Sequence, residues 1–365
     1  CSGLVQLKRR FCSNDHCAQQ HRFDIMQAQG PAASTRQRTA LGDLSNKYNQ
    51  VKDPVRGNKG AKGLSGKLAG GLVGSRGLFD RNHEDVGQSA VKEIVDKVDM
   101  ADIDNPQAVI PYLADIHRHY REAETVNVAS AEYMTKQNDI NEKMRAILID
   151  WLVEVHLKFK LMIETLYLTV NVIDRFLEKE TITRNKLQLV GVTAMFLSSK
   201  YEEIYAPECR DFVYISDKAY TREQILAMEG DVLAKLNFQL TTPNAYVFLK
   251  RFCKVAGIIS SPRSKTEFLA NFLVELTLQE YKMLKYLPSM IAASAVYLAL
   301  KTMGQPCWSP ELVQHACYSE SAIASCVHDL NQLHKDTPKN NLQAVRKKYA
   351  QEKHGAVSGI PPANL

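Results

Sequence analysis

Between residues 142 and 159 the sequence places apolar side chains on almost every turn of a helix. Met144, Leu148, Trp151 and Val155 recur at intervals of three or four residues, and this spacing lines one face of a helix. Further apolar residues fill part of the opposite side. Because a helix that is apolar nearly all round lies inside a domain, we expect this segment to be a central, buried helix.

Comparable periodic segments continue to about residue 335, and prolines mark several of the breaks between them. No segment alternates apolar and polar residues convincingly enough to predict a strand. Three polar residues stand where helix N-caps are expected: Asp139, three residues before Glu142, and Thr183 and Thr221. The chain therefore predicts an all-α body, with further helices near 106–124, 163–179, 184–200, 207–214, 222–236, 244–256, 265–281, 288–303 and 320–335.

Two heptapeptides suggest an internal repeat, AMFLSSK at 194–200 and AVYLALK at 295–301. They hold equivalent places in two successive sets of five helices, which indicates two similar helical domains. The predicted organisation is a disordered basic tail at 1–105, an N-terminal helix and lead-in at 106–137, a first domain at 138–240, a second at 241–340 and a C-terminal tail at 341–365.

The first 90 residues differ in character from the rest of the chain. They carry 14 Lys and Arg against 7 Asp and Glu, whereas the remainder has 32 against 33. They are also rich in Gln, Asn, Ser and Gly and offer few apolar residues for a core, so this segment is expected to be disordered. A basic tail on a neutral body favours nuclear targeting or contact with acidic partners. No nucleic-acid-reading module follows, so direct binding to nucleic acid is not expected.

Several kinds of chemistry are not supported by the sequence. Cys12, His16, Cys17 and His21 are metal-capable, but their spacing is poor for a zinc site. No phosphate-binding loop, nucleophile elbow or His-Glu-x-x-His pattern is present. The longest apolar run, 287–300, is shorter than the roughly 18 residues of a membrane span. We expect no enzyme activity, no cofactor, no metal and no membrane partner.

The segment MRAILIDWLVEVHLKF, followed by TLYLTVNVIDRFL and KLQLVGVTAMFLSSKYEEIYAPE, resembles the cyclin box. The HLKF tetrapeptide is similar to the mitotic, B-type cyclins. The resemblance covers residues 107 to about 345 and implies two tandem five-helix cyclin folds. It also implies a regulatory subunit that binds and activates a cyclin-dependent Ser/Thr kinase at the G2/M transition. The alternatives are an A-type cyclin acting in S/G2 and, further off, a cyclin-fold transcription or pocket-type binding protein.

Arg145 lies near the start of the central apolar helix, where a buried guanidinium needs a carboxylate partner. Asp174, late in the next helix, is the natural partner, and the resemblance to cyclins implies the same internal pair. We assign Arg145 and Asp174 to the fold. The resemblance implies that Lys200 and Glu229 bind the kinase beside its mobile regulatory helix. Taken alone, those two residues would be interpreted as a solvated ion pair of little energetic value.

The resemblance further implies a shallow exposed groove that docks Arg-x-Leu peptides of substrates or inhibitors. Its apolar lining would be formed by Met144, Ile147, Leu148 and Trp151. Glu154 and Gln188 match the polar residues beside that groove and would bind the arginine and the backbone of the peptide. An apolar anchor combined with a charged one is an economical way to hold an extended segment.

The nonapeptide RTALGDLSN at 38–46 resembles the destruction box of mitotic cyclins, which the ubiquitin ligase of mitotic exit recognises. The resemblance makes Arg38 the charged anchor and Leu41 the apolar anchor, with Leu44 and Asn46 extending the contact. Together with a kinase partner, this implies a protein of the nucleus and cytoplasm that is removed by ubiquitin-dependent degradation.

Overall fold

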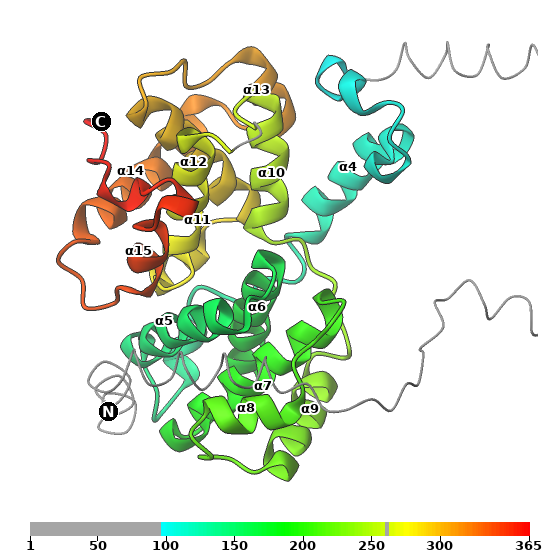
Figure 1. The fold of residues 1–365 in the computed structure, drawn as a ribbon, viewed down its shortest axis with the longest axis vertical. Coiled ribbons are helices and arrows are strands. Elements are labelled where there is room, and N and C mark those ends of the chain that lie inside the picture. Colours follow the sequence, from blue (N-terminus) through cyan, green and yellow to red (C-terminus); the bar gives the residue numbers. More distant parts are fainter. Residues whose placement is uncertain (1–95, 260–262) are drawn as a thin grey trace, which may run out of the picture. The chain divides into compact units, whose positions relative to one another are not determined.

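The computed structural model describes residues 96–259 and 263–365 (Figure 1). In these ranges the regular elements are all helices, as the apolar periodicity predicts. The first domain contains α5 (Glu142–Phe159), α6 (Ile163–Lys179), α7 (Arg184–Glu202), α8 (Cys209–Ile215) and α9 (Arg222–Lys235). The second contains α10 (Ala245–Val255), α11 (Lys265–Thr277), α12 (Pro288–Thr302), α13 (Pro310–Ala316) and α14 (Glu320–Asp336).

Shorter elements precede, connect and follow these two sets. Between residue 96 and the start of α5 lie four short 3₁₀ helices and one α-helix, namely η2 (Lys97–Asp102), η3 (Pro106–Ala108), η4 (Ile110–Tyr112), α4 (Leu113–Ala123) and η5 (Tyr133–Lys136). The remaining elements are η6 (Tyr281–Lys285), α15 (Ala344–Tyr349), η7 (Glu352–His354) and η8 (Val357–Gly359).

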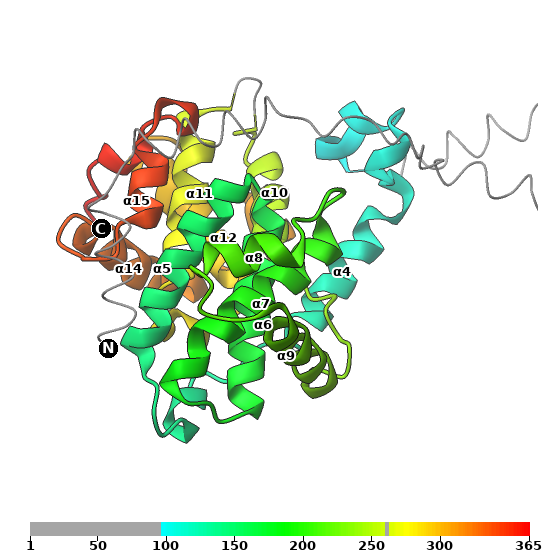
Figure 2. The same cartoon turned by 60° about the horizontal axis from the view of Figure 1, so that its bottom comes forward.

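Helix α7 is the centre of the first domain, and α5, α6, α8 and α9 all contact it (Figures 1 and 2). All residues from Leu187 to Ser199 are buried. A Cβ atom on Gly191 would lie 2.7 Å from Cδ1 of Leu148, closer than such atoms approach in folded proteins. Glycine at this position therefore allows α5 and α7 to approach each other. In the second domain, α12 is the corresponding centre and contacts α10, α11, α13 and α14.

The start of α5 differs from the sequence prediction. Its N-cap is Asn141, whose side chain accepts a hydrogen bond from Met144 N at 3.0 Å. Asp139 instead accepts from the backbone N of Arg184 at 2.8 Å and from its Nε at 2.7 Å. The carboxylate predicted to cap α5 therefore holds the first residue of α7. Thr221 does cap α9, in a reciprocal capping box with Gln224.

Both predicted tails contain ordered structure at the ends nearest the body. Residues 341–365 include α15, in which Ala344, Val345, Lys348 and Tyr349 are buried. Oδ1 of Asp150 in α5 accepts hydrogen bonds from Ala344 N and from Nε2 of Gln279, both at 2.9 Å. The segment therefore packs onto both domains. At the other end, η2 lies inside the range predicted as a disordered tail.

Candidate functional site

Lys200 and Glu229 come together on the first domain. Lys200 is in the last turn of α7 and Glu229 is in the middle of α9, and their side chains form an ion pair between Nζ and Oε1. The Lys200 ammonium also lies 4.3 Å from the ring centroid of Phe196. The Lys200 side chain is 43% exposed and that of Glu229 is 12% exposed. The carboxylate is therefore fixed in the domain while the ammonium stays accessible.

Large apolar side chains are exposed in the segments that follow Lys200 and Glu229 in the sequence. Tyr201 is 47% exposed, Ile204 88%, Tyr205 92% and Phe238 71%. We call these four residues the apolar rim. The hydroxyl of Tyr201 is hydrogen-bonded to Oγ1 of Thr241, which joins the end of α7 to the loop that carries Phe238. Exposed apolar groups beside a charged pair are typical of a protein-binding surface.

The loop after α9 has an unusual backbone. Asn237 and Phe238 both have positive φ angles, 50° and 57°. A bulky aromatic residue in the left-handed region is uncommon and costs free energy of about 1 to 3 kcal/mol. Here that conformation accompanies an aromatic ring that is mostly exposed to solvent. The apolar rim is not evident from the sequence, because exposed and buried apolar residues look alike there.

The predicted peptide groove on α5 is only partly a surface. Leu148 is fully buried against Gly191, so the expectation that it lines an exposed groove is wrong. Met144 and Trp151 are 3% and 7% exposed, which leaves only their edges accessible. Ile147 and Glu154 are half-buried.

Gln188, on the neighbouring helix α7, is the other polar residue predicted for this groove. It is 6% exposed, and its Nε2 atom has no hydrogen-bond partner in the structure. A buried amide donor without an acceptor is costly. An acceptor supplied by a bound peptide would remove that cost.

Arg145 and Asp174 form the ion pair predicted from the sequence. Nε and Nη2 of Arg145 donate to the two carboxylate oxygens of Asp174 at 2.6 and 2.7 Å. Nη1 of Arg145 donates to the carbonyl oxygen of Leu278, at the end of α11, at 3.1 Å. The Tyr133 hydroxyl donates to Asp174 at 2.8 Å. Burial alone would lower the pKa of Arg145, but the charge of Asp174 raises it, so the guanidinium stays ionised inside the protein.

The nonapeptide that includes Arg38, Leu41, Leu44 and Asn46 lies outside the described residues. Over residues 96–259 and 263–365, His, Cys, Asp and Glu side chains form no cluster suited to a metal ion. Within the same part of the chain, no helix has the combination of length and apolar content that crossing a membrane requires.

Comparison with known proteins identifies the family to which this chain belongs. The model of the cyclin N-terminal domain matches residues 115–241, and that of the cyclin C-terminal domain matches residues 243–363. G2/mitotic-specific cyclin-1 of Medicago sativa subsp. varia is 46% identical over 269 residues, which cover 73% of this chain and 62% of that protein. Cyclin-B2-2 of Oryza sativa subsp. indica is 43% identical over 281 residues, covering 77% and 66%.

A solved structure, the viral cyclin from herpesvirus saimiri, has the same fold, with a TM-score of 0.55 and 19% identity over 60% of this chain and 96% of that one. The chain matches less than two thirds of the length of the two curated relatives. Two cyclin domain models nevertheless cover the described body almost from end to end. The chain therefore belongs to the cyclin family, and its curated relatives include mitotic, B-type cyclins.

Proposed function

We propose that this chain is a regulatory subunit, without an active site of its own, that binds and activates a cyclin-dependent kinase at the G2/M transition. The observation that supports this most is the Lys200–Glu229 pair with the apolar rim beside it. The names of the relatives, which include a G2/mitotic-specific cyclin and a B-type cyclin, point to the same phase.

The proposed mechanism is a shift of population. A protein kinase is active only when the lysine of its β3 strand pairs with a glutamate on its mobile αC helix. A rigid surface that binds αC in its inward position favours the active state by its difference in affinity for the two states. The apolar rim would supply the buried contact area, and Lys200 would donate hydrogen bonds to the kinase backbone. Glu229 would hold the ammonium in place.

Lys200→Glu is expected to reduce kinase activation at least about tenfold, since it places two carboxylates together in the contact surface and removes the donor. The measurement is phosphate transfer to a Ser-Pro peptide by a cyclin-dependent kinase mixed with the purified chain. Lys235→Glu is the matched control, because Lys235 forms a surface pair with Glu180 at 2.6 Å and is similarly exposed. If Lys200→Glu activates the kinase as well as Lys235→Glu does, and circular dichroism shows that both variants are folded, the proposal is refuted.

The same assay also tests substrate docking. We propose that the exposed edge of α5, with Glu154 and Gln188, binds Arg-x-Leu segments. Gln188→Leu should then remove the preference for substrates that carry such a segment and leave activity on the short Ser-Pro peptide unchanged. If the preference survives in Gln188→Leu, the docking site lies elsewhere.

We also propose that residues 38–46 direct ubiquitin-dependent degradation of a protein found in the nucleus and cytoplasm, on the strength of their resemblance to a destruction box. Arg38→Ala combined with Leu41→Ala should lengthen the lifetime of the chain in an extract leaving mitosis, because both anchors are removed. Kinase activation by the purified variant should not change. An unaltered half-life relative to the parent chain would contradict this role.

A further inference from the structure

Three aspartates precede the first domain at intervals of three residues, Asp96, Asp99 and Asp102. The segment forms the 3₁₀ helix η2, with Asp96 as its N-cap. A 3₁₀ helix has three residues per turn, so side chains at this spacing lie above one another. The three carboxylates therefore share one face. We call them the acidic triplet.

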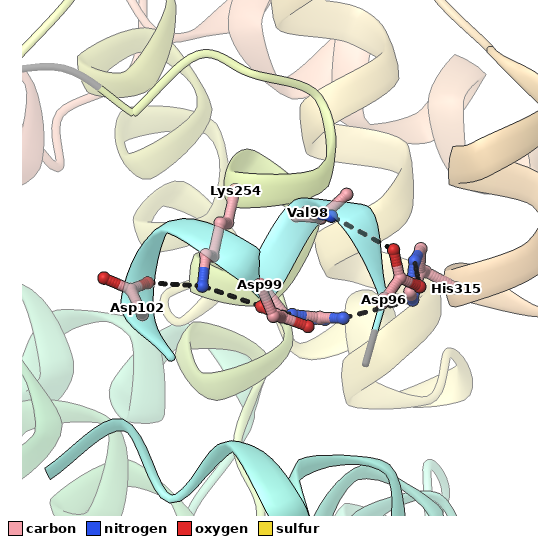
Figure 3. Close-up of polar contacts among 7 residues, drawn as sticks. Asp96, Val98, Asp99, Asp102, Lys254 and His315 are labelled. Carbon is pink, nitrogen blue, oxygen red and sulfur yellow. Dashed lines mark hydrogen bonds and ion pairs between the residues drawn. The ribbon is translucent and has the colours of Figure 1, made fainter. Parts of the chain in front are cut away.

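That face meets cationic groups of the second domain (Figure 3). Oδ1 of Asp99 accepts hydrogen bonds from Nη1 of Arg251 at 2.6 Å and from Nζ of Lys254 at 2.7 Å. Lys254 also donates to Oδ2 of Asp102 at 2.6 Å. Arg251 and Lys254 stand three residues apart on α10, so both are presented on one face of that helix.

The third aspartate is paired with α13. Nε2 of His315 lies 2.9 Å from Oδ2 of Asp96, and Nδ1 of the same ring lies 3.4 Å from Nη2 of Arg251. Burial raises the pKa of Asp99, but the hydrogen bonds from Arg251 and Lys254 lower it by more. The pKa of Asp99 is therefore below its ordinary value. The central carboxylate of the triplet is therefore ionised at neutral pH.

Very little apolar surface supports these contacts. We call residues 96–124 the N-terminal arm; its only fully buried residues are Asp99, Ile110 and Glu124. Tyr120 is half-buried and contacts the ring of Phe248 edge-on, with centroids 6.4 Å apart. Helix α4 buries no residue completely. The other apolar residues of the arm are half-buried, such as Leu113 and Ile116, or exposed, so apolar burial holds the arm less firmly than it holds the helices of the two domains.

The far end of the arm is also attached through a carboxylate. Glu124 accepts hydrogen bonds from the backbone N and from Oγ of Ser289, at 2.8 and 2.7 Å, in the first turn of α12. Backbone N–H groups in a first helical turn have no partner within their own helix. Nη1 of Arg121 lies 3.2 Å from Oε1 of Glu124. The guanidinium of Arg121 also lies over the ring of Tyr318, 4.6 Å from its centroid.

We propose that the N-terminal arm is a separately opening unit, held on the second cyclin fold by the acidic triplet at one end and Glu124 at the other. Elements with little buried apolar area open locally at a fraction of the global free energy of unfolding. Opening would separate Asp99 and Asp102 from Arg251 and Lys254 and return all four charges to water. The state of the arm would then be controlled by charge.

The test is hydrogen–deuterium exchange on the full chain, read by mass spectrometry. Asp99→Asn should raise exchange across residues 96–123 at least about tenfold, which corresponds to about 1.4 kcal/mol of opening free energy. Exchange in α11 and in the later turns of α12, which the arm does not cap, should not change. Asp104→Asn is the matched control, because Asp104 lies in the same segment, is exposed and undergoes the same chemical change.

A second variant, Lys254→Gln, keeps the proposal falsifiable if Asp99→Asn folds poorly. It removes the cation that joins Asp99 to Asp102, and its side chain is 27% exposed, so folding should tolerate the change. It should also reduce the effect of raising the salt concentration on exchange in the arm. The proposal is overturned if neither variant exceeds the control, or if α11 and the later turns of α12 loosen together with the arm. The measurement involves no kinase, so it succeeds or fails independently of the proposed function.

Discussion

Asp174→Asn is expected to lower the free energy of unfolding by about 3 to 5 kcal/mol, because it leaves a buried guanidinium without its counter-charge. Arg145 is 1% exposed and Asp174 is 3% exposed, so water cannot replace the lost carboxylate. The substitution hardly changes side-chain volume, so the loss can be assigned to the charge. The Tyr133 hydroxyl would also lose its ionised acceptor.

Urea unfolding measures this effect directly, since the midpoint shifts at constant slope when only stability changes. Asp115→Asn is the control, because Asp115 pairs with Arg118 at 2.6 Å while both side chains are at least 65% exposed. Surface pairs of that kind contribute little. A midpoint for Asp174→Asn that coincides with that of the control would show that the buried pair is not required for stability.

Lys348→Met should have an effect of similar size, about 3 to 5 kcal/mol, for the same reason at the other end of the chain. Nζ of Lys348 in α15 donates to both carboxylate oxygens of Glu275 in α11, each at 2.8 Å. The Tyr349 hydroxyl donates to the same carboxylate at 2.9 Å. Glu275 is fully buried and Lys348 is 3% exposed. Without the ammonium, a carboxylate would remain inside the second domain with only neutral donors.

The neighbouring residue gives a close control for this measurement. Lys347→Met makes the same chemical change at an exposed position and should leave the unfolding midpoint nearly unchanged. The double variant Lys348→Met with Glu275→Gln should recover part of the loss, because it removes the unpaired charge. If the single variants at 347 and 348 are equally stable, the buried pair contributes nothing measurable.

The sequence predicts the long helices well and misses some of the short ones, although it does predict the seven-residue α8 near 207–214. Helix α6 has the predicted bounds of 163–179, because a periodic apolar face over several turns leaves little choice of position. Helices α13 and α15 have only seven and six residues, which is less than two full turns each. The sequence does not predict them. Their positions depend on tertiary contacts, which a local pattern does not encode.

Two of the buried ion pairs show the same limit for individual residues. Arg145 could be matched to Asp174 because both lie on strongly predicted helices and a buried cation demands an anion. Glu275 cannot be matched to Lys348 from the sequence, because the sequence predicts a tail for the segment that carries Lys348. Likewise, the resemblance to cyclins places Leu148 in an exposed groove, whereas its burial follows from the close approach of α7, which only the structure shows.

The hydrogen bonds of Asp150 connect the first cyclin repeat to segments in the second half of the chain. This carboxylate belongs to the first repeat, yet its partners Gln279 and Ala344 N lie beyond the start of the second. Arg145 depends on the second repeat in the same way, through the carbonyl of Leu278. A fragment ending near residue 240 would lack these partners, so Arg145 and Asp150 in α5 would lose hydrogen bonds that the full chain provides. The two halves therefore share a helical pattern but are not interchangeable modules.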